Sequence, residues 1–449
     1  MENTTYDLTR GSILKKLLTV ALPLMANQLM QMSYNLTDMF WLGRTGHDAV
    51  SASGSAGRYM WFGAGLMMLG RIGCEIGVSQ SLGKGDKNTA KKFTQNAAYI
   101  GGIVGIIYAL VLIFQREPLI GFFGFREQHV IKDAQEYLMI VAIAVPMTNI
   151  TSVIGGAYTG AGNSRTPFIL NAMGLAVNMI LDPLFINTFG MGVRGAAIAT
   201  ITGQIFVFFL SIFAVKLSRN RPFEKFSFFV KPDFEKILRM LGWASPIALE
   251  SVLFCFLSMV TDRYTTSFGS YAMAVSQVGS QVESLTWLVG GGYASSLISY
   301  VGQNYGAKKF DRISRGINIS FGIMGGWGLM VTLLLLIFGR QLFGIFLSEP
   351  TLMDYGAAFL KILAFAQIPM CMEGVSGGAF KGTGNSLPPA IVSISINVLR
   401  VVGVHFLSKT SLGLYGIWIA VSAGAVVKGI WATLWYLMYK KKLQVKMGV

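Results

Sequence analysis

The chain has 449 residues, of which 53% are hydrophobic and 13% are charged. A mean hydropathy of +0.55 is too high for a water-soluble protein of this length, so lipid is expected to surround most of the chain. Lys and Arg number 37 against 21 acidic residues. Because the basic residues gather between long apolar runs, they indicate orientation in a membrane rather than nucleic-acid binding.

The polar stretch Met1 to Ser12 leads into an apolar run that is too long for a cleavable signal, so we expect this run to remain as a membrane helix. Cys74, Cys255 and Cys371 are too few and too scattered for a disulfide framework or a metal site, and we interpret them as packing residues. The sequence has three His and no Walker motif or nucleophile elbow. We therefore expect neither an enzyme nor a cofactor.

A membrane span needs roughly 20 mainly apolar residues. Runs of this length predict twelve transmembrane helices. In chain order they lie near 14–41, 50–81, 93–115, 137–158, 166–189, 195–216, 237–261, 271–302, 316–338, 357–379, 388–408 and 414–438.

The chain repeats itself at an offset of about 222 residues, which is right for a duplicated six-helix unit. The segment from Gly156 to Pro167, GAYTGAGNSRTP, matches GAFKGTGNSLPP from Gly378 to Pro389, and Pro23 matches Pro246. We predict an all-α membrane protein of two six-helix lobes, 1–218 and 237–449, related by a pseudo-two-fold axis along the membrane normal. Residues 219–236 form the linker between the lobes.

Lys and Arg are most numerous in the loops that are cytoplasmic when the N-terminus is inside, and the linker carries the largest basic group. Both termini are therefore predicted to be cytoplasmic, in a multi-pass protein of the cell membrane. We expect a monomer whose partners are small-molecule substrates and membrane lipids, without nucleic acid.

Asp38 is the first carboxylate inside a predicted span, where a charge costs about 3 kcal/mol. Tyr34 and Gln31 precede it by four and seven residues and share its helix face. The functional interpretation is that Asp38 binds the coupling cation or proton, with Gln31 and Tyr34 in the substrate cavity. The alternative is that Asp38 reaches the outer interface.

Asn178 and Asp182 lie four residues apart and present an amide and a carboxylate on one face of the fifth span. This pair suits a dehydrated cation or a shared proton, and the hydroxyl of Thr200 on the sixth span adds a third oxygen. The alternative for Asp182 is a structural role at a helix bend, because Pro183 follows it.

Arg71 and Glu75, also four apart, predict an ion pair without a transport role. In the second lobe we expect Glu373 to pair with Arg400 or Lys428, and its functional alternative is to attract cationic substrate in the cavity. The roles of Glu250 and Glu283 stay open.

The chain resembles the multidrug and toxic compound extrusion (MATE) family over its full length. The resemblance rests on Pro23, the segments QSLGKGD and QNYGAKK, the paired GNS turns, and Asn178 to Pro183. It is similar to the DinF-like branch, and it implies alternating access between two six-helix bundles. It also implies a coupling site at Asp38, Asn178, Asp182 and Thr200, and a first helix that bends near Pro23.

These observations predict a proton- or sodium-coupled antiporter that exports lipophilic, mostly cationic drugs or toxic compounds. Protons are favoured, because two carboxylates share a proton without an exact ligand cage. Sodium at the same oxygens is the alternative, and no other metal is expected. A flippase or an exporter of a lipid-linked or anionic metabolite is the second hypothesis, since Arg58, Arg71, Arg400 and Lys428 fall within spans. A channel or a membrane enzyme ranks far behind both.

Overall fold

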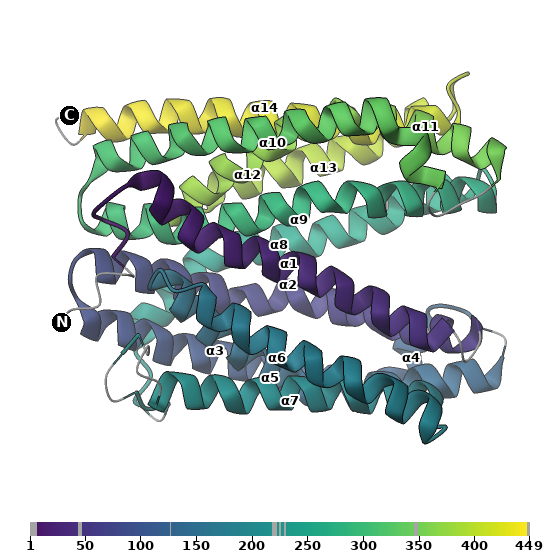
Figure 1. Cartoon of the computed structure of the whole chain (residues 1–449), viewed down its shortest axis with the longest axis horizontal. Helices are drawn as coiled ribbons and strands as arrows, with labels where there is room; N and C mark the ends of the chain where they lie inside the picture. The colour runs from purple at the N-terminus through teal and green to yellow at the C-terminus, as the bar shows by residue number, and fades with distance from the viewer. Residues whose placement is uncertain are drawn as a thin grey trace. The chain divides into compact units, whose positions relative to one another are not determined.

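The structure, a computed structural model, describes residues 7–43, 47–125, 127–217, 222–223, 226–228, 230–344 and 349–446. Within these ranges the side chains of residues 34–36, 38–40, 47, 270 and 443–446 lie outside the description. The described residues form helices α1 to α14 and one π-helical turn (Figure 1).

Each predicted span falls on a helix. The first six spans are α1 (Ile13–Gly43), α2 (His47–Gly83), α3 (Lys87–Phe114), α5 (Gln128–Gly160), α6 (Arg165–Pro183) and α7 (Gly192–Leu217). The last six are α8 (Phe234–Thr266), α9 (Ser270–Gly306), α10 (Phe310–Gly344), the pair α11 (Pro350–Ala364) and α12 (Gln367–Gly382), α13 (Leu387–Leu407) and α14 (Leu414–Lys446). The short helix α4 (Arg116–Gly121) follows α3, and the π-helical turn η2 (Leu184–Thr188) extends α6.

By length and apolar composition, nine of the described helices can cross a membrane, and the bent pair of α11 and α12 makes ten. Helices α2 and α9 are 37 residues long but rich in Gly and Ser, which lowers their hydropathy. The two helices occupy equivalent places in the two halves of the chain, so the lower hydropathy of the second helix is a feature that both halves share.

The tenth span was predicted as one helix, 357–379, and the structure corrects this to two helices bent by 45°. Pro369 has no N–H to donate to the carbonyl of Phe365, the residue that follows the end of the first helix. Side chains satisfy the carbonyls at the break. Thr332 Oγ1 donates to Ala364 O at 3.0 Å and Gln367 Nε2 to Leu363 O at 2.8 Å.

The sequence repeat is present in the helix boundaries. Helices α2 and α9 end at Gly83 and Gly306, and α5 and α12 end at Gly160 and Gly382. All four ends close in the same way, with a bond from an N–H to the carbonyl five residues earlier, next to a residue of positive φ. Three of these residues are Gly, and the fourth is Lys308, with φ 58°.

Glycines allow α2 to approach α5 closely in the first half, and α9 to approach α12 in the second. A Cβ on Gly160 would lie 2.7 Å from the carbonyl oxygen of Glu75, and one on Gly378 would lie 2.5 Å from that of Ala294. Gly156 and Gly382 complete the two pairs, spaced four residues apart as in other close contacts of membrane helices.

The chain forms two compact units. Unit 1 consists of Met1–Leu8 and Ala26–Ala248, and unit 2 of Thr9–Met25 and Leu249–Val449. The units differ from the predicted lobes because the first part of α1 belongs to unit 2, and the linker with the first part of α8 belongs to unit 1. In both helices the change of unit follows a proline, Pro23 or Pro246, by two residues.

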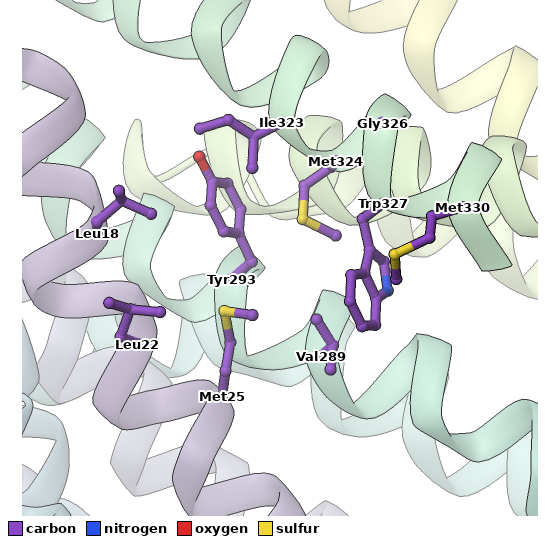
Figure 2. Close-up of a pocket in the computed structure, with 10 residues that line it drawn as sticks. All are labelled: Leu18, Leu22, Met25, Val289, Tyr293, Ile323, Met324, Gly326, Trp327 and Met330. Atoms are coloured by element: carbon purple, nitrogen blue, oxygen red, sulfur yellow. The ribbon is translucent and has the colours of Figure 1, made fainter.

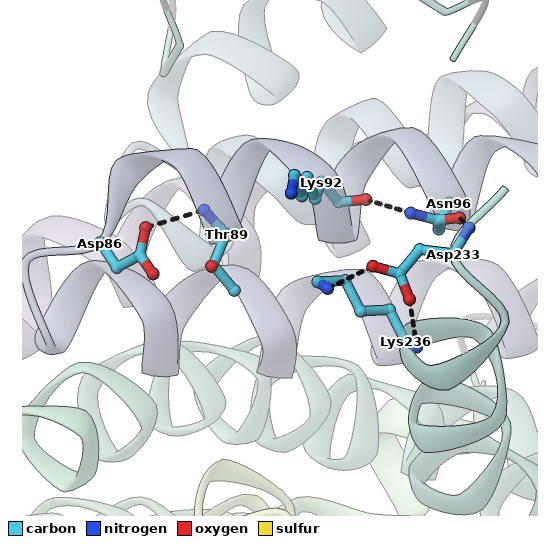
Figure 3. Close-up of polar contacts among 6 residues, drawn as sticks. All are labelled: Asp86, Thr89, Lys92, Asn96, Asp233 and Lys236. Atoms are coloured by element: carbon cyan, nitrogen blue, oxygen red, sulfur yellow. Dashed lines mark hydrogen bonds and ion pairs between the residues drawn. The ribbon is translucent and has the colours of Figure 1, made fainter. Parts of the chain in front are cut away.

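Hydrogen bonds hold the segments that precede these two helices. In unit 1 the linker lies on α3, where Val230 N donates to Tyr99 Oη at 3.0 Å. Asp233 N donates to Asn96 Oδ1 at 2.7 Å, as Figure 3 shows. Asp233 also caps α8 through Lys236. In unit 2 the carbonyl oxygen of Thr9 accepts a bond from Lys309 Nζ at 2.8 Å, and that of Arg10 accepts one from Arg312 Nη2 at 3.2 Å.

Candidate functional site

Helix α6 holds the predicted amide and carboxylate pair in the interior of unit 1. Asn178 is 2% exposed and Asp182 is fully buried. Asn178 Nδ2 donates to Asp182 Oδ1 at 3.2 Å, as the four-residue spacing predicted. Asn178 Oδ1 is also buried and has no hydrogen-bond partner among the described residues. The pair therefore offers at least one amide oxygen for a proton donor or a cation.

Thr200 lies on α7, three residues before Gly203 and therefore on the same side of the helix. It is 6% exposed, and Gly203, three residues later, faces Asn178. A Cβ on Gly203 would lie 3.4 Å from Asn178 Cβ, so the glycine keeps α7 close to this part of α6. The helices thus bring the third predicted oxygen to the side of α7 that meets the pair.

Helix α1 carries the remaining predicted residues of the first half. The backbone of Asp38 and Tyr34 lies in the helix, but both side chains lie outside the described residues. Gln31 is exposed. The facing of Asp38 and Asp182, and the cavity assigned to Gln31 and Tyr34, stay predictions.

One contact between α1 and α6 was missed by the sequence analysis. Asn171 Nδ2 donates to Asn27 Oδ1 at 2.9 Å, within unit 1. The signal was present in the spacing, because Asn171 lies seven residues before Asn178 and Asn27 lies four before Gln31. Each helix therefore has a polar face, and the two faces meet at this hydrogen bond.

Glu373 on α12 pairs with Lys428 on α14, with 3.1 Å between Oε2 and Nζ. The expected contact of Glu373 is therefore present, and its partner is Lys428 rather than Arg400. The side chains are 24% and 18% exposed, so the pair lies mostly within unit 2. The alternative role of Glu373, binding of cationic substrate, stays a prediction.

The expected ion pair between Arg71 and Glu75 is wrong, since none joins them in the described part of the chain. Both residues lie where α2 meets α5. The stem of Arg71 packs on Gly156, whose Cβ would lie 3.3 Å from Arg71 Cγ, while Glu75 is fully buried beside Gly160. Contact with the neighbouring helix, rather than the spacing along α2, decides where these side chains lie.

An apolar pocket of about 240 Å³ lies within unit 2 (Figure 2). Side chains from the first part of α1, from α9 and from α10 turn toward one another around it. Gln31 and Glu373, which we assigned to a cavity, are not among the residues that line it. Its lining consists of Leu18, Leu22, Met25, Val289, Tyr293, Ile323, Met324, Gly326, Trp327 and Met330.

Comparisons with known proteins agree with this architecture. A family model described as MatE matches residues 23–184 and 246–405. A protein of Thermotoga maritima, named probable multidrug resistance protein NorM, is 26% identical, over 95% of this chain and 93% of its own length. A FAD transporter of Shewanella oneidensis is 23% identical, over 95% and 94%.

A crystal structure of MATE in the bent conformation matches with a TM-score of 0.94 at 20% identity, over 100% of each chain. This similarity shows the fold. It confirms the predicted class, an all-α membrane protein with twelve transmembrane helices in two halves of six.

Proposed function

Because the chain belongs to the MatE family of membrane transporters, we propose that it exports lipophilic, mostly cationic compounds in exchange for an inward-moving cation. The observation that carries this proposal is the buried pair of Asn178 and Asp182 in α6. A carboxylate at this depth is costly, and intramembrane carboxylates mark proton or ion pathways. The multidrug resistance name of the Thermotoga maritima relative supports the class of substrate.

Asp38 completes the coupling site in this proposal, and the hydrogen bond between Asn27 and Asn171 supports it. The spans alternate in direction, so α1 and α6, the first and fifth spans, run the same way. Asp38 follows Asn27 by eleven residues, and Asp182 follows Asn171 by eleven. At 1.5 Å per residue, the Cα atoms of the two residues then lie at the same height along the two helices.

In this proposal the two carboxylates lie close to one another, where they cannot both ionise cheaply, and they share a proton. Protonation from outside favours the state that releases substrate, and loss of the proton inside favours the state that binds it. Proton binding and substrate binding therefore disfavour one another, which couples export to proton entry. Sodium is the alternative cation, with Asn178 and Thr200 completing an oxygen cage.

Dye efflux from sealed vesicles tests this function, with pH and sodium gradients imposed separately at a fixed membrane potential. We expect export under the pH gradient alone, and its loss in Asp38→Asn and Asp182→Asn. Asp354→Asn is the control, because this carboxylate of α11 is 66% exposed and pairs with Arg340. Normal efflux in both coupling variants would contradict the site, and export that needs sodium would replace the proton while keeping the residues.

We also propose that the protein is a monomer of the cell membrane, of the DinF-like branch, with both termini cytoplasmic. The basic linker supports this orientation. Single cysteines placed at Lys231 and at Phe189, in a chain without native cysteines, test it. We expect an impermeant thiol reagent added to intact cells to label the second position and not the first.

The second candidate function is export of an anionic metabolite. It is favoured by the similarity to the FAD transporter of Shewanella oneidensis and by the basic residues in the spans of unit 2. FAD efflux from vesicles under the same two gradients separates this candidate from export of cationic compounds.

A further inference from the structure

Arg400 occupies the place in unit 2 that Asn178 occupies in unit 1. The two residues are 222 positions apart, the offset of the repeat, and each packs against a glycine of the last helix of its half. Gly203 of α7 faces Asn178, and Gly424 of α14 faces Arg400. The same groove between neighbouring helices therefore holds an amide beside an acid in one unit and a cation in the other.

Three contacts fix the Arg400 side chain. Its stem lies on Gly424, where a Cβ would be 3.4 Å from Arg400 Cβ and 3.6 Å from Cδ. Its guanidinium lies 5.5 Å from the ring centroid of Phe254. Nη2 donates to Ser258 Oγ at 3.4 Å. Phe254 and Ser258 are four apart on α8, so one face of that helix supports both the plane and one edge of the guanidinium.

The donors of this guanidinium are largely unused. A guanidinium has five N–H groups, and Arg400 makes one long bond to a neutral hydroxyl. Its Nε is buried and has no hydrogen-bond partner within the described part of the chain. None of the ion pairs among the described residues includes Arg400, whereas Lys428 is neutralised by Glu373. Arg400 is thus a partly buried, positioned cation whose guanidinium forms no ion pair with any residue that the structure describes.

Acidic residues also influence Arg400. Asp262 and Glu283 act electrostatically on the charge of Arg400, and Glu283 also acts on that of Lys428. Unit 2 thus places carboxylates near a guanidinium with free donors. A ligand that carries both an anionic and a cationic group matches this arrangement better than a simple cation does.

We propose that Arg400 binds the carboxylate of zwitterionic substrates, which the guanidinium fork would hold in a two-point contact while the cationic group lies toward Glu283 and Asp262. This inference rests on the proposed export function and names one class of its substrates. Among the second-half cations Lys428 is not the anion site, because Glu373 already occupies it. The neutral partners Phe254 and Ser258 orient the guanidinium without competing for its charge.

Rhodamine 110 and rhodamine 123 test the proposal, because they differ only in that the carboxylate of the first is a methyl ester in the second. Their binding to the purified protein is measured by fluorescence anisotropy, and their export from vesicles by efflux. We expect Arg400→Gln to weaken rhodamine 110 binding at least tenfold and to change rhodamine 123 binding by less than twofold. Arg400→Lys, which keeps the charge but loses the fork, should fall between these.

Arg340→Gln is the matched control, because this arginine of α10 is 57% exposed and pairs with Asp354. Thermal unfolding checks that each variant is folded. The proposal is overturned if wild type binds rhodamine 110 no more tightly than Arg400→Gln does, or if folded Arg400→Gln and Arg400→Lys lose both dyes equally. Rhodamine 110 binding that depends on Arg400, without export under either gradient, would contradict the proposed transport function and leave the anion site standing.

Discussion

Glu373 of α12 and Lys428 of α14 lie 3.1 Å apart, and this contact joins two residues that are 55 positions apart in the sequence. Removal of one partner leaves a charge in a mostly buried place. We expect Glu373→Gln or Lys428→Gln alone to lower the free energy of unfolding by about 1–3 kcal/mol, below the cost for a fully buried pair because both side chains are partly exposed. Unfolding in detergent with a denaturant measures this.

The double variant separates a structural pair from a substrate site. Glu373→Gln with Lys428→Gln should recover part of the lost stability, because neither charge is left alone. Dye export by the double variant should stay near that of wild type if the pair is structural. Export that falls in Glu373→Gln and in the double variant alike, with stability restored in the latter, would assign Glu373 to the cavity.

Two adjacent glycines of α12 provide a matched test of helix packing. A Cβ on Gly378 would lie 2.5 Å from the carbonyl oxygen of Ala294 on α9, whereas one on Gly377 would meet nothing within 4 Å. Gly378→Ala should lower the free energy of unfolding by about 1–3 kcal/mol, because the backbone of α9 must shift. Gly377→Ala should raise it by about 0.5–1 kcal/mol, as expected for Ala in a helix. Equal effects at the two positions would rule out the close approach.

Lys308 and Gly85 are equivalent residues with φ of 58° and 80°. Lysine has a Cβ, so it is strained in this region, where glycine is not. We expect Lys308→Gly to stabilise the protein by about 0.5–1 kcal/mol and Gly85→Ala to destabilise it by about 1 kcal/mol. Melting temperatures of the two variants should therefore shift in opposite directions, and shifts of the same sign would contradict the shared turn.

Asp86 precedes α3 and accepts a bond from Thr89 N at 2.9 Å (Figure 3). Hydrogen bonds from the Thr89 side chain and backbone hold the pKa of the Asp86 carboxyl below its usual value. Since the folded pKa lies below the unfolded one, the stabilisation is present above about pH 4 and is lost as the pH falls through the folded pKa. Asp86→Asn keeps the hydrogen bond to Thr89 N but has no carboxyl to titrate. The melting temperature of this variant should therefore fall less than that of wild type between pH 6 and pH 3.

Asp86→Ala supplies the control for the cap. It should lose about 1 kcal/mol at pH 7, because the N–H of Thr89 then has no side-chain acceptor. An alanine variant as stable as wild type at pH 7 would show that the cap contributes nothing.

The sequence alone determined the duplication and where the spans lie, apart from the break in the tenth span between α11 and α12. Apolar runs are set by the lipid that surrounds them, which is a local requirement, and the repeated glycines close equivalent helices by the same backbone geometry. The spacing of Asn178 and Asp182 was enough to predict their hydrogen bond, because residues four apart on a helix always share a face.

The tertiary structure decided which helices meet and how each is rotated. Spacing alone paired Arg71 with Glu75, but the glycines of α5 draw both residues against another helix. Lys428 rather than Arg400 became the partner of Glu373, which left Arg400 to stack on Phe254. These contacts depend on how helices that are distant in the chain are rotated and how far apart they lie. Rotation and separation result from the packing of many side chains, so no local sequence pattern predicts them.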